Sequence, residues 1–143
     1  MTGLTGYDTC HCLALRRGSR HITRLYDTHL ASAGITTSQF SIMSVIDKRP
    51  EIRVSELGAI MVMERTTLLR SLKPLQTEGW ITSTKADGER AHVFKLTPLG
   101  KQRLENAAPL WREAQASFEA AFGAERAERL RSDNLAVGAV DAL

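Results

Sequence analysis

Residues 53–100 read RVSELGAIMVMERTTLLRSLKPLQTEGWITSTKADGERAHVFKLTPLG, and the first half of this stretch has the pattern of two short helices in tandem. Ser55 is a good N-cap for the helix SELGAIM. A second helix is predicted from about Glu64 to Glu78, because its leucines recur at helical spacing and Gly79 supplies a C-terminal stop. A tight turn joins the two helices.

The second half of the stretch predicts a β-hairpin. Residues Ile81–Lys85 and His92–Leu96 alternate as strands do, and the Asp87-Gly88 pair between them is a strong turn signal. Two helices followed by a hairpin is the order of elements in a winged helix-turn-helix, where the hairpin is the wing. The sequence therefore predicts a mainly α fold with a small β-hairpin wing.

The second predicted helix has two chemically different faces. Its leucines can pack against the rest of the domain, whereas its polar and basic residues suit a helix that lies in the major groove of double-stranded DNA. The alternative is an ordinary solvated helix surface. The apolar face consists of Leu68, Leu69, Leu72 and Leu75, and the polar face of Arg65, Thr66, Thr67, Arg70 and Ser71.

The basic residues of these elements are the candidates for DNA contact. Arg65 and Arg70 can each donate two hydrogen bonds to guanine O6 and N7 or bind a phosphate, and Arg70 is the preferred candidate for reading a base. On the hairpin, Lys85, Arg90 and Lys95 are candidates for the minor groove or the phosphates. The alternative for Arg90 is a surface ion pair with one of the acidic residues beside it.

Helical patterns fill the rest of the chain. A long first helix is followed by a second that the Arg49-Pro50 pair ends, and two more helices follow the hairpin. The predicted ranges are 9–31 with Asp8 or Thr9 as N-cap and Gly34 as stop, a helix capped by Thr37-Ser38 and running to about Ile46, Pro98 to about Phe122, and about Glu125–Val140.

Composition sets broad limits on the protein. A chain of 143 residues with 43% hydrophobic and 24% charged residues is typical of one globular domain. A net charge of +3 and a pI near 9.1 are compatible with a polyanionic partner but do not establish one. With two cysteines and no long apolar run, the sequence predicts neither a disulfide framework nor a signal peptide nor a membrane span. We expect a cytoplasmic protein.

These parts, in this order, resemble the MarR family of bacterial transcription regulators over nearly the whole chain. The most specific segment is SELGAIMVMERTTLLRSLKPLQTEGWI, residues 55–81, with its closing Leu-x-x-x-Gly. The other is ERAHVFKLTPLGKQRL, residues 89–104, in which a basic wing strand leads into Leu96-Thr97-x-x-Gly100. The resemblance implies a homodimer that binds an inverted-repeat operator, usually as a repressor, and that releases DNA on binding a small phenolic or other aromatic effector or on thiol oxidation.

The sequence departs from the family pattern at two positions. The family's wing usually has Asp-x-Arg, and here Gly88 occupies the Asp position before Arg90. Arg90 therefore lacks its usual brace and would either be held by Glu89 or be more mobile at the groove. Pro74 lies inside the second helix of the motif, where a missing N–H and a ring clash cost ~3 kcal/mol and are expected to kink the helix.

The terminal helices predict a dimerisation region. The winged body has its own apolar residues, so those of the last segment need a second surface, which the same helices of another subunit would supply. We expect residues 1–34 and 98–143 to form this region and residues 35–97 the DNA-binding region. The alternative is a monomer in which the last helix folds back on the first. The apolar residues concerned are Leu110, Trp111, Phe118, Phe122, Leu130, Leu135, Val137 and Val140.

The resemblance also implies a ligand pocket between the first, second and fifth helices and the winged body. Matching positions would give an aromatic-lined cavity with a cation for a carboxylate. Each residue has a simpler role as core or solvated surface. The positions are Arg17, Arg20, His21, Phe40, Met43 and Trp111.

Cys10 and Cys12 offer metal-binding or redox chemistry, but their spacing argues against a shared role. Two helical residues at i and i+2 point about 200° apart, so these thiols would neither pair nor hold one ion unless the helix frayed. A thiol near a helix start is nevertheless a candidate for oxidation. Burial in a dimer interface is the simpler reading.

Three functions therefore stay open. The first is an effector-responsive dimeric repressor, the second a thiol-based oxidant sensor on the same fold, and the third an architectural winged-helix module. No catalytic or phosphate-binding motif is found, so we expect no enzyme activity, no cofactor and no metal.

Overall fold

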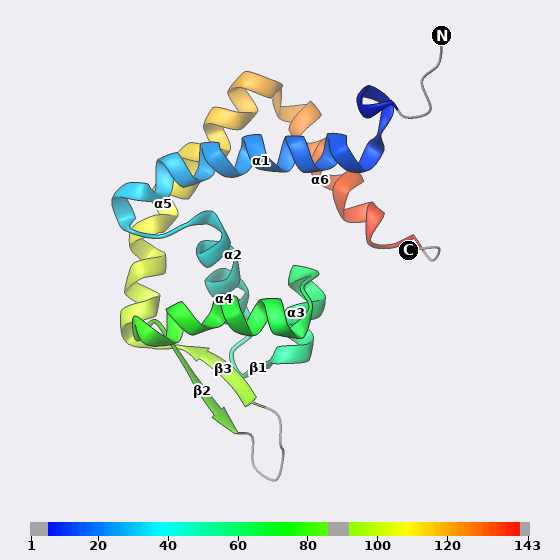
Figure 1. Cartoon of the computed structure of the whole chain (residues 1–143). Helices are drawn as coiled ribbons and strands as arrows, with labels where there is room; N and C mark the ends of the chain where they lie inside the picture. Colours follow the sequence, from blue (N-terminus) through cyan, green and yellow to red (C-terminus); the bar gives the residue numbers. More distant parts are fainter. Residues whose placement is uncertain (1–5, 86–91, 141–143) are drawn as a thin grey trace. The chain divides into compact units, whose positions relative to one another are not determined.

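The computed structural model describes residues 6–85 and 92–140. Its elements divide between two compact units (Figure 1). The winged unit comprises residues 30–110, and the helical unit comprises the chain up to residue 29 together with the chain from residue 111. The elements are η1 (Tyr7–Thr9), α1 (His11–Leu30), η2 (Ala31–Ala33), α2 (Thr37–Lys48), β1 (Ile52–Arg53), α3 (Val54–Met61), α4 (Arg65–Thr77), β2 (Ile81–Lys85), β3 (His92–Leu96), α5 (Pro98–Phe122) and α6 (Ala124–Val137).

The sheet of the winged unit has three antiparallel strands in the order β1-β3-β2. The bounds of β2 and β3 confirm the prediction residue for residue. Strand β1 was not predicted, and it pairs with β3 through Ile52 opposite Phe94 and Arg53 opposite Val93. The wing is therefore a hairpin with a short third strand along the free edge of β3, close to the start of α3 (Figure 1).

The core of the winged unit is formed by one side of each helix and one face of the sheet. Leucines recur three or four positions apart in α4, so three of them reach the interior together. All buried residues of the described chain are apolar. In this unit they are Leu30, Ile35, Phe40, Ile42, Met43, Ile46, Ile52, Val54, Leu57, Leu68, Leu72, Leu75, Trp80, Ile81, Val93, Phe94, Gly100, Leu104 and Ala107.

Helix α2 begins one residue earlier than predicted, because Thr36 rather than Thr37 or Ser38 is its N-cap. The Thr36 hydroxyl oxygen accepts a hydrogen bond from the Gln39 amide at 3.1 Å, and Gln39 Oε1 accepts one from the Thr36 amide at 3.0 Å. This reciprocal capping box satisfies two of the amide groups that a helix start leaves without partners. The helix then runs past the expected end at Ile46 to Lys48.

Pro74 does not end α4, the second helix of the predicted helix-turn-helix and hence its recognition helix. Helix α4 continues from Arg65 to Thr77, and the Glu78 amide donates to the Pro74 carbonyl at 2.9 Å. Proline removes only its own backbone donor, so the turns on either side stay bonded. Gly79 then ends the segment with φ of 74°, a left-handed conformation that glycine adopts without strain.

The helical unit contains α1, the second half of α5 and α6, and it buries few large side chains. Tyr26 on α1 donates a hydrogen bond to Gln115 Oε1 on α5. Partial burial raises the pKa of the Tyr26 phenol, Glu119 raises that pKa further, and Arg131 opposes them. The rings of Phe118 and Phe122 stack with centroids 5.2 Å apart. A groove of about 1000 Å³ lies among these helices.

Candidate nucleic-acid interface

Helix α4 has one side in the core of the winged unit and the other side in solvent. Its three buried leucines define the inner side. Successive helical residues are turned by about 100°, so the outer side is fixed by geometry. The residues directly opposite the leucines are all exposed and are Thr66, Arg70, Lys73 and Thr77.

The predicted recognition residues do not all lie on this outer side. Thr66 and Arg70 face away from the core, and Thr67 lies beside them. Arg65 lies above the leucine side and is exposed because it is the first residue of the helix; all four side chains are exposed. Ser71 is half-buried, and its hydroxyl donates to the Thr67 carbonyl at 3.1 Å, within the helix itself. The structure thus brings Thr66 and Arg70 together on one surface and directs Ser71 inward.

The prediction that Leu69 belongs to the apolar face is wrong. Leu69 is 40% exposed, because it lies between the buried leucines and the outer row around the helix. An apolar side chain at that position is available for a contact outside this chain.

Lys73 is a candidate that the sequence reasoning missed. It follows Arg70 by three positions and Thr66 by seven, which places all three on one side of an α-helix. Its spacing from Thr66 and Arg70 is the sequence signal that identifies it. The outer side of α4 therefore carries two cations, one turn apart.

The wing carries further basic residues at the described strands. Lys85 ends β2 opposite His92 at the start of β3, and both are exposed, as is Lys95. Gln76 on α4 donates a hydrogen bond of 3.3 Å to Ser83 Oγ on β2, which links the recognition helix to the wing. Arg90, the predicted minor-groove residue, lies outside the described residues together with Asp87, Gly88 and Glu89.

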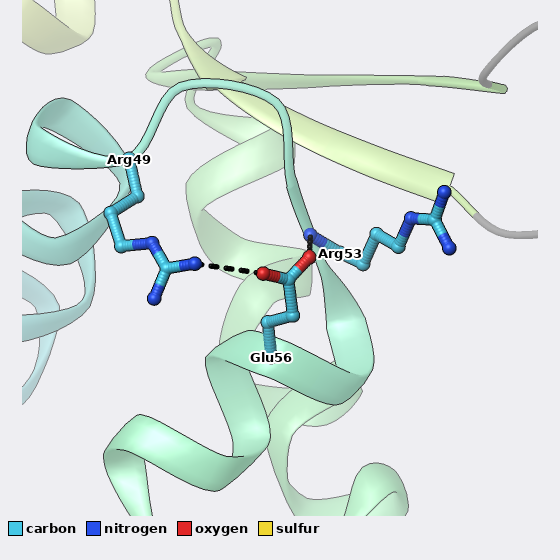
Figure 2. Close-up of polar contacts among 3 residues, drawn as sticks. All are labelled: Arg49, Arg53 and Glu56. Carbon is cyan, nitrogen blue, oxygen red and sulfur yellow. Dashed lines mark hydrogen bonds and ion pairs between the residues drawn. The ribbon is translucent and has the colours of Figure 1, made fainter.

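A small charged cluster fixes the start of α3 beside the recognition helix (Figure 2). Glu56 Oε2 pairs with Arg49 Nη2 at 2.8 Å, and Glu56 Oε1 accepts from the Arg53 amide at 3.4 Å. The Arg53 guanidinium points away from Glu56 (Figure 2). Both members of the ion pair are substantially exposed, so the pair contributes at most about 1 kcal/mol. Its main effect is to hold the end of α2 against the start of α3.

The predicted effector residues are divided between the two units. Phe40 and Met43 are buried in the core of the winged unit. Arg17, Arg20 and His21 are exposed on α1, and Trp111 is half-buried on α5 in the helical unit. Within this set, His21 lines the 1000 Å³ groove. A common pocket for the six residues stays a prediction.

The two cysteines lie at the start of α1, but not as predicted. The helix begins at His11 rather than at residue 9, and Cys10 before it has extended backbone with ψ of 114°. Cys10 Sγ accepts from the Leu13 amide at 3.4 Å, so Cys10 itself acts as the N-cap. Both thiols are exposed. The two side chains are therefore not fixed about 200° apart, because that angle applies only to two helical residues.

Within residues 6–85 and 92–140, no cluster of three or more His, Cys, Asp or Glu side chains is arranged to hold a metal ion. None of the helices in the same ranges is both long enough and apolar enough to cross a membrane.

Comparisons with known proteins show which family this chain matches. The model described as "MarR family" matches residues 35–91. The transcriptional regulator SarZ of Staphylococcus saprophyticus is 28% identical over 91 residues, which cover 63% of this chain and 62% of SarZ. The organic hydroperoxide resistance regulator of Bacillus subtilis is 27% identical over 97 residues, 67% of this chain and 66% of that protein. The match thus spans slightly less than two thirds of either relative.

A solved structure extends the likeness over most of the chain. The regulator MosR of M. tuberculosis, in complex with DNA, is 35% identical and superposes with a TM-score of 0.81. The match covers 90% of this chain and 93% of MosR. The likeness therefore includes the helical unit as well as the winged unit.

Proposed function

The chain belongs to the MarR family of transcription regulators, and on that premise we propose that it binds an inverted-repeat DNA operator as a homodimeric repressor that a small aromatic effector releases. MosR, its relative, was solved in complex with DNA. For this chain, the main support for DNA binding is the outer side of α4, where Thr66, Arg70 and Lys73 face solvent opposite the buried leucines.

In this proposal α4 lies in the major groove. Arg70 is central on the exposed side and reads guanine through O6 and N7, and Thr66 is short enough to let the helix approach the bases. Arg65 and Lys73 contact phosphates on either side. Lys85 and Arg90 of the wing bind the adjacent minor groove or its phosphates.

The homodimer is supported by the apolar groove of the helical unit. The groove is lined mainly by apolar residues of α1, α5 and α6, among them Leu15, Phe118 and Leu130. Gly18 lies in it, and a Cβ atom at Gly18 would meet nothing within 4 Å, which leaves room for another helix to approach closely. Leu15 and Leu130 are substantially exposed in the single chain. A second copy of the same helices would bury these side chains.

The effector is proposed to be a small aromatic carboxylate or phenol. Trp111 offers a half-buried aromatic surface, and Arg17, Arg20 and His21 offer exposed cationic or hydrogen-bonding groups on α1. Phe40 and Met43 are buried in the core of the winged unit, so they are not assigned to effector binding. A coupling of ~1–3 kcal/mol between effector and DNA would change operator affinity about 5- to 150-fold.

DNA binding is tested by selecting sequences from a random duplex pool with the purified chain. We expect an inverted repeat to be enriched and bound at least about 1000-fold more tightly than unrelated DNA at physiological salt. Arg70→Ala should lose this preference, whereas Arg112→Ala, which removes one charge from α5, should keep it. Equal affinity for all sequences would instead support an architectural module.

Thiol-based oxidant sensing is the second candidate, because Cys10 and Cys12 are both exposed at the start of α1 and Cys10 is not helical. A hydroperoxide would oxidise one thiolate to a sulfenic acid and leave as the alcohol or water. The second thiol would then attack that sulfur, form the disulfide and release water. Peroxide treatment of the wild type, Cys10→Ser and Cys12→Ser, followed by operator binding, separates this candidate from effector release.

A further inference from the structure

Hydrogen bonds tie the start of α5 to Gly79 and Trp80, shortly after the end of the recognition helix at Thr77. The Thr97 amide donates to the Trp80 carbonyl at 3.0 Å, and the Thr97 hydroxyl donates to the Gly79 carbonyl at 2.6 Å. Two turns further along α5, the Arg103 guanidinium lies over the Trp80 ring, 5.6 Å from its centroid. Trp80 is only 5% exposed, so its ring is held in the core of the winged unit.

Arg103 also contacts the segment that precedes α2. Its Nη1 donates to the Ala33 carbonyl at 3.5 Å, a long hydrogen bond at the end of η2. The same Nη1 lies 3.8 Å from the position that a Cβ atom on Gly34 would take. One exposed guanidinium thus bridges the indole of Trp80 and the chain between α1 and α2.

These contacts matter because of where the chain passes between the two units. It passes once at residues 29–30, where α1 leads into η2, and once at residues 110–111, inside α5. Arg103 is on α5 and touches η2. Arg103 therefore joins Trp80, three residues after the end of α4, to η2 at the first passage and to α5, which contains the second passage.

We propose that Arg103 is a positioning residue for operator binding: it joins both passages of the chain to Trp80 and so fixes α4 relative to them. This rests on the proposed DNA binding. Arg103 does not touch DNA in this role, because its guanidinium is held over the indole, where a cation is attracted by the ring face. Lysine at position 103 keeps the charge near the ring and one donor for Ala33, so it restores part of the function.

The test uses the full chain with Trp111→Phe, which leaves Trp80 as the one tryptophan of the sequence. In this background Arg103→Met removes the guanidinium and keeps an unbranched stem, Arg103→Lys is the conservative variant, and Arg112→Met is the control for loss of one charge on α5. Each is measured well below its unfolding temperature for Trp80 emission, for affinity to the selected inverted repeat, and for the dependence of that affinity on salt.

We expect Arg103→Met to shift Trp80 emission and to weaken operator binding roughly 3- to 10-fold, the size expected for one exposed cation–π contact and one long hydrogen bond. The salt slope should stay at the wild-type value, since no phosphate contact is lost. Arg103→Lys should recover most of the affinity. Arg112→Met should bind the operator as tightly as the Trp111→Phe parent protein.

Wild-type affinity in Arg103→Met would overturn the positioning role while leaving operator binding intact. A salt slope reduced by about one charge would also overturn it, because Arg103 would then be a phosphate contact. Failure of the parent to prefer any inverted repeat would instead refute the proposed function.

Discussion

Gly100 lies directly against the backbone of Trp80: a Cβ atom on Gly100 would be 1.9 Å from the Trp80 carbonyl oxygen. No side chain fits there unless the start of α5 moves away from the end of the recognition segment. We expect Gly100→Ala to lower the free energy of unfolding by about 3 kcal/mol, the upper range for overpacking. Urea unfolding measures this.

The matched control is Gly138→Ala at the end of α6. Gly138 has φ of −70° and its nearest neighbour to a new Cβ is 3.7 Å away, so alanine fits without strain. Its free energy of unfolding should stay within about 0.5 kcal/mol of the wild type. An equally stable Gly100→Ala would contradict the close packing of α5 on Trp80.

Val62 is strained in the turn between α3 and α4. It has φ of 53° and ψ of 51°, a left-handed conformation that β-branched residues rarely adopt, and its side chain is 87% exposed. Because burial offsets little of this strain, Val62→Gly should raise the free energy of unfolding by about 1 kcal/mol.

The reverse substitution, from glycine to a residue with a side chain, can be made at Gly34 and measured by the same free energy of unfolding. Its φ is 70°, so Gly34→Ala should lower the free energy of unfolding by about 1 kcal/mol. If Val62→Gly is no more stable than the wild type, the left-handed conformation of Val62 does not destabilise the fold, and the prediction is wrong.

Arg70, Lys73 and Arg90 should affect DNA binding differently. Arg70→Ala should cost ~1–3 kcal/mol and relax the preference at one position of each half-site. Lys73→Ala and Arg90→Ala should weaken binding to all sequences alike and reduce the salt slope by about one charge each. Affinities for the operator and for single-base variants at several salt concentrations separate the two classes. If Arg70→Ala weakened all sequences equally, Arg70 would be a phosphate contact.

Gly18 tests the dimer interface. Leucine at this position would fill the space that the groove leaves around α1 and block a second copy. We expect Gly18→Leu to shift the protein from dimer to monomer in analytical ultracentrifugation, with the helix content unchanged because leucine is a better helix former than glycine. Ala116→Leu, exposed on α5 outside the groove lining, is the control. A dimer that survives Gly18→Leu would place the interface elsewhere.

The elements with strong local sequence signals could be predicted from the sequence alone. Asp87-Gly88 between alternating segments placed both wing strands, and the helical period from Pro98 to Phe122 placed α5, with the observed bounds in each case. The fold class is confirmed by the winged-helix structures that the chain resembles. Terminal positions were less certain: α6 runs from Ala124 to Val137, not from Glu125 to Val140.

What was missed depends on contacts between distant residues. Strand β1 has two residues and no periodicity of its own, so only its pairing with β3 reveals it. Arg103 carried no local signal, because its role comes from Trp80 and Ala33, which lie far from it in sequence. Cys10 was assigned to a helix that begins one residue after it, since helix boundaries depend on the capping group that is used.

The most direct test of DNA recognition is a hydroxyl-radical footprint on the DNA upstream of the coding region. A two-fold dimer presents both α4 helices to one side of the duplex, so we expect two protected blocks with centres ~10 bp apart on an inverted repeat. Arg70→Ala should remove both blocks together at the protein concentration that saturates the wild type. Protection of one isolated half-site, or uniform protection without sequence preference, would contradict the account.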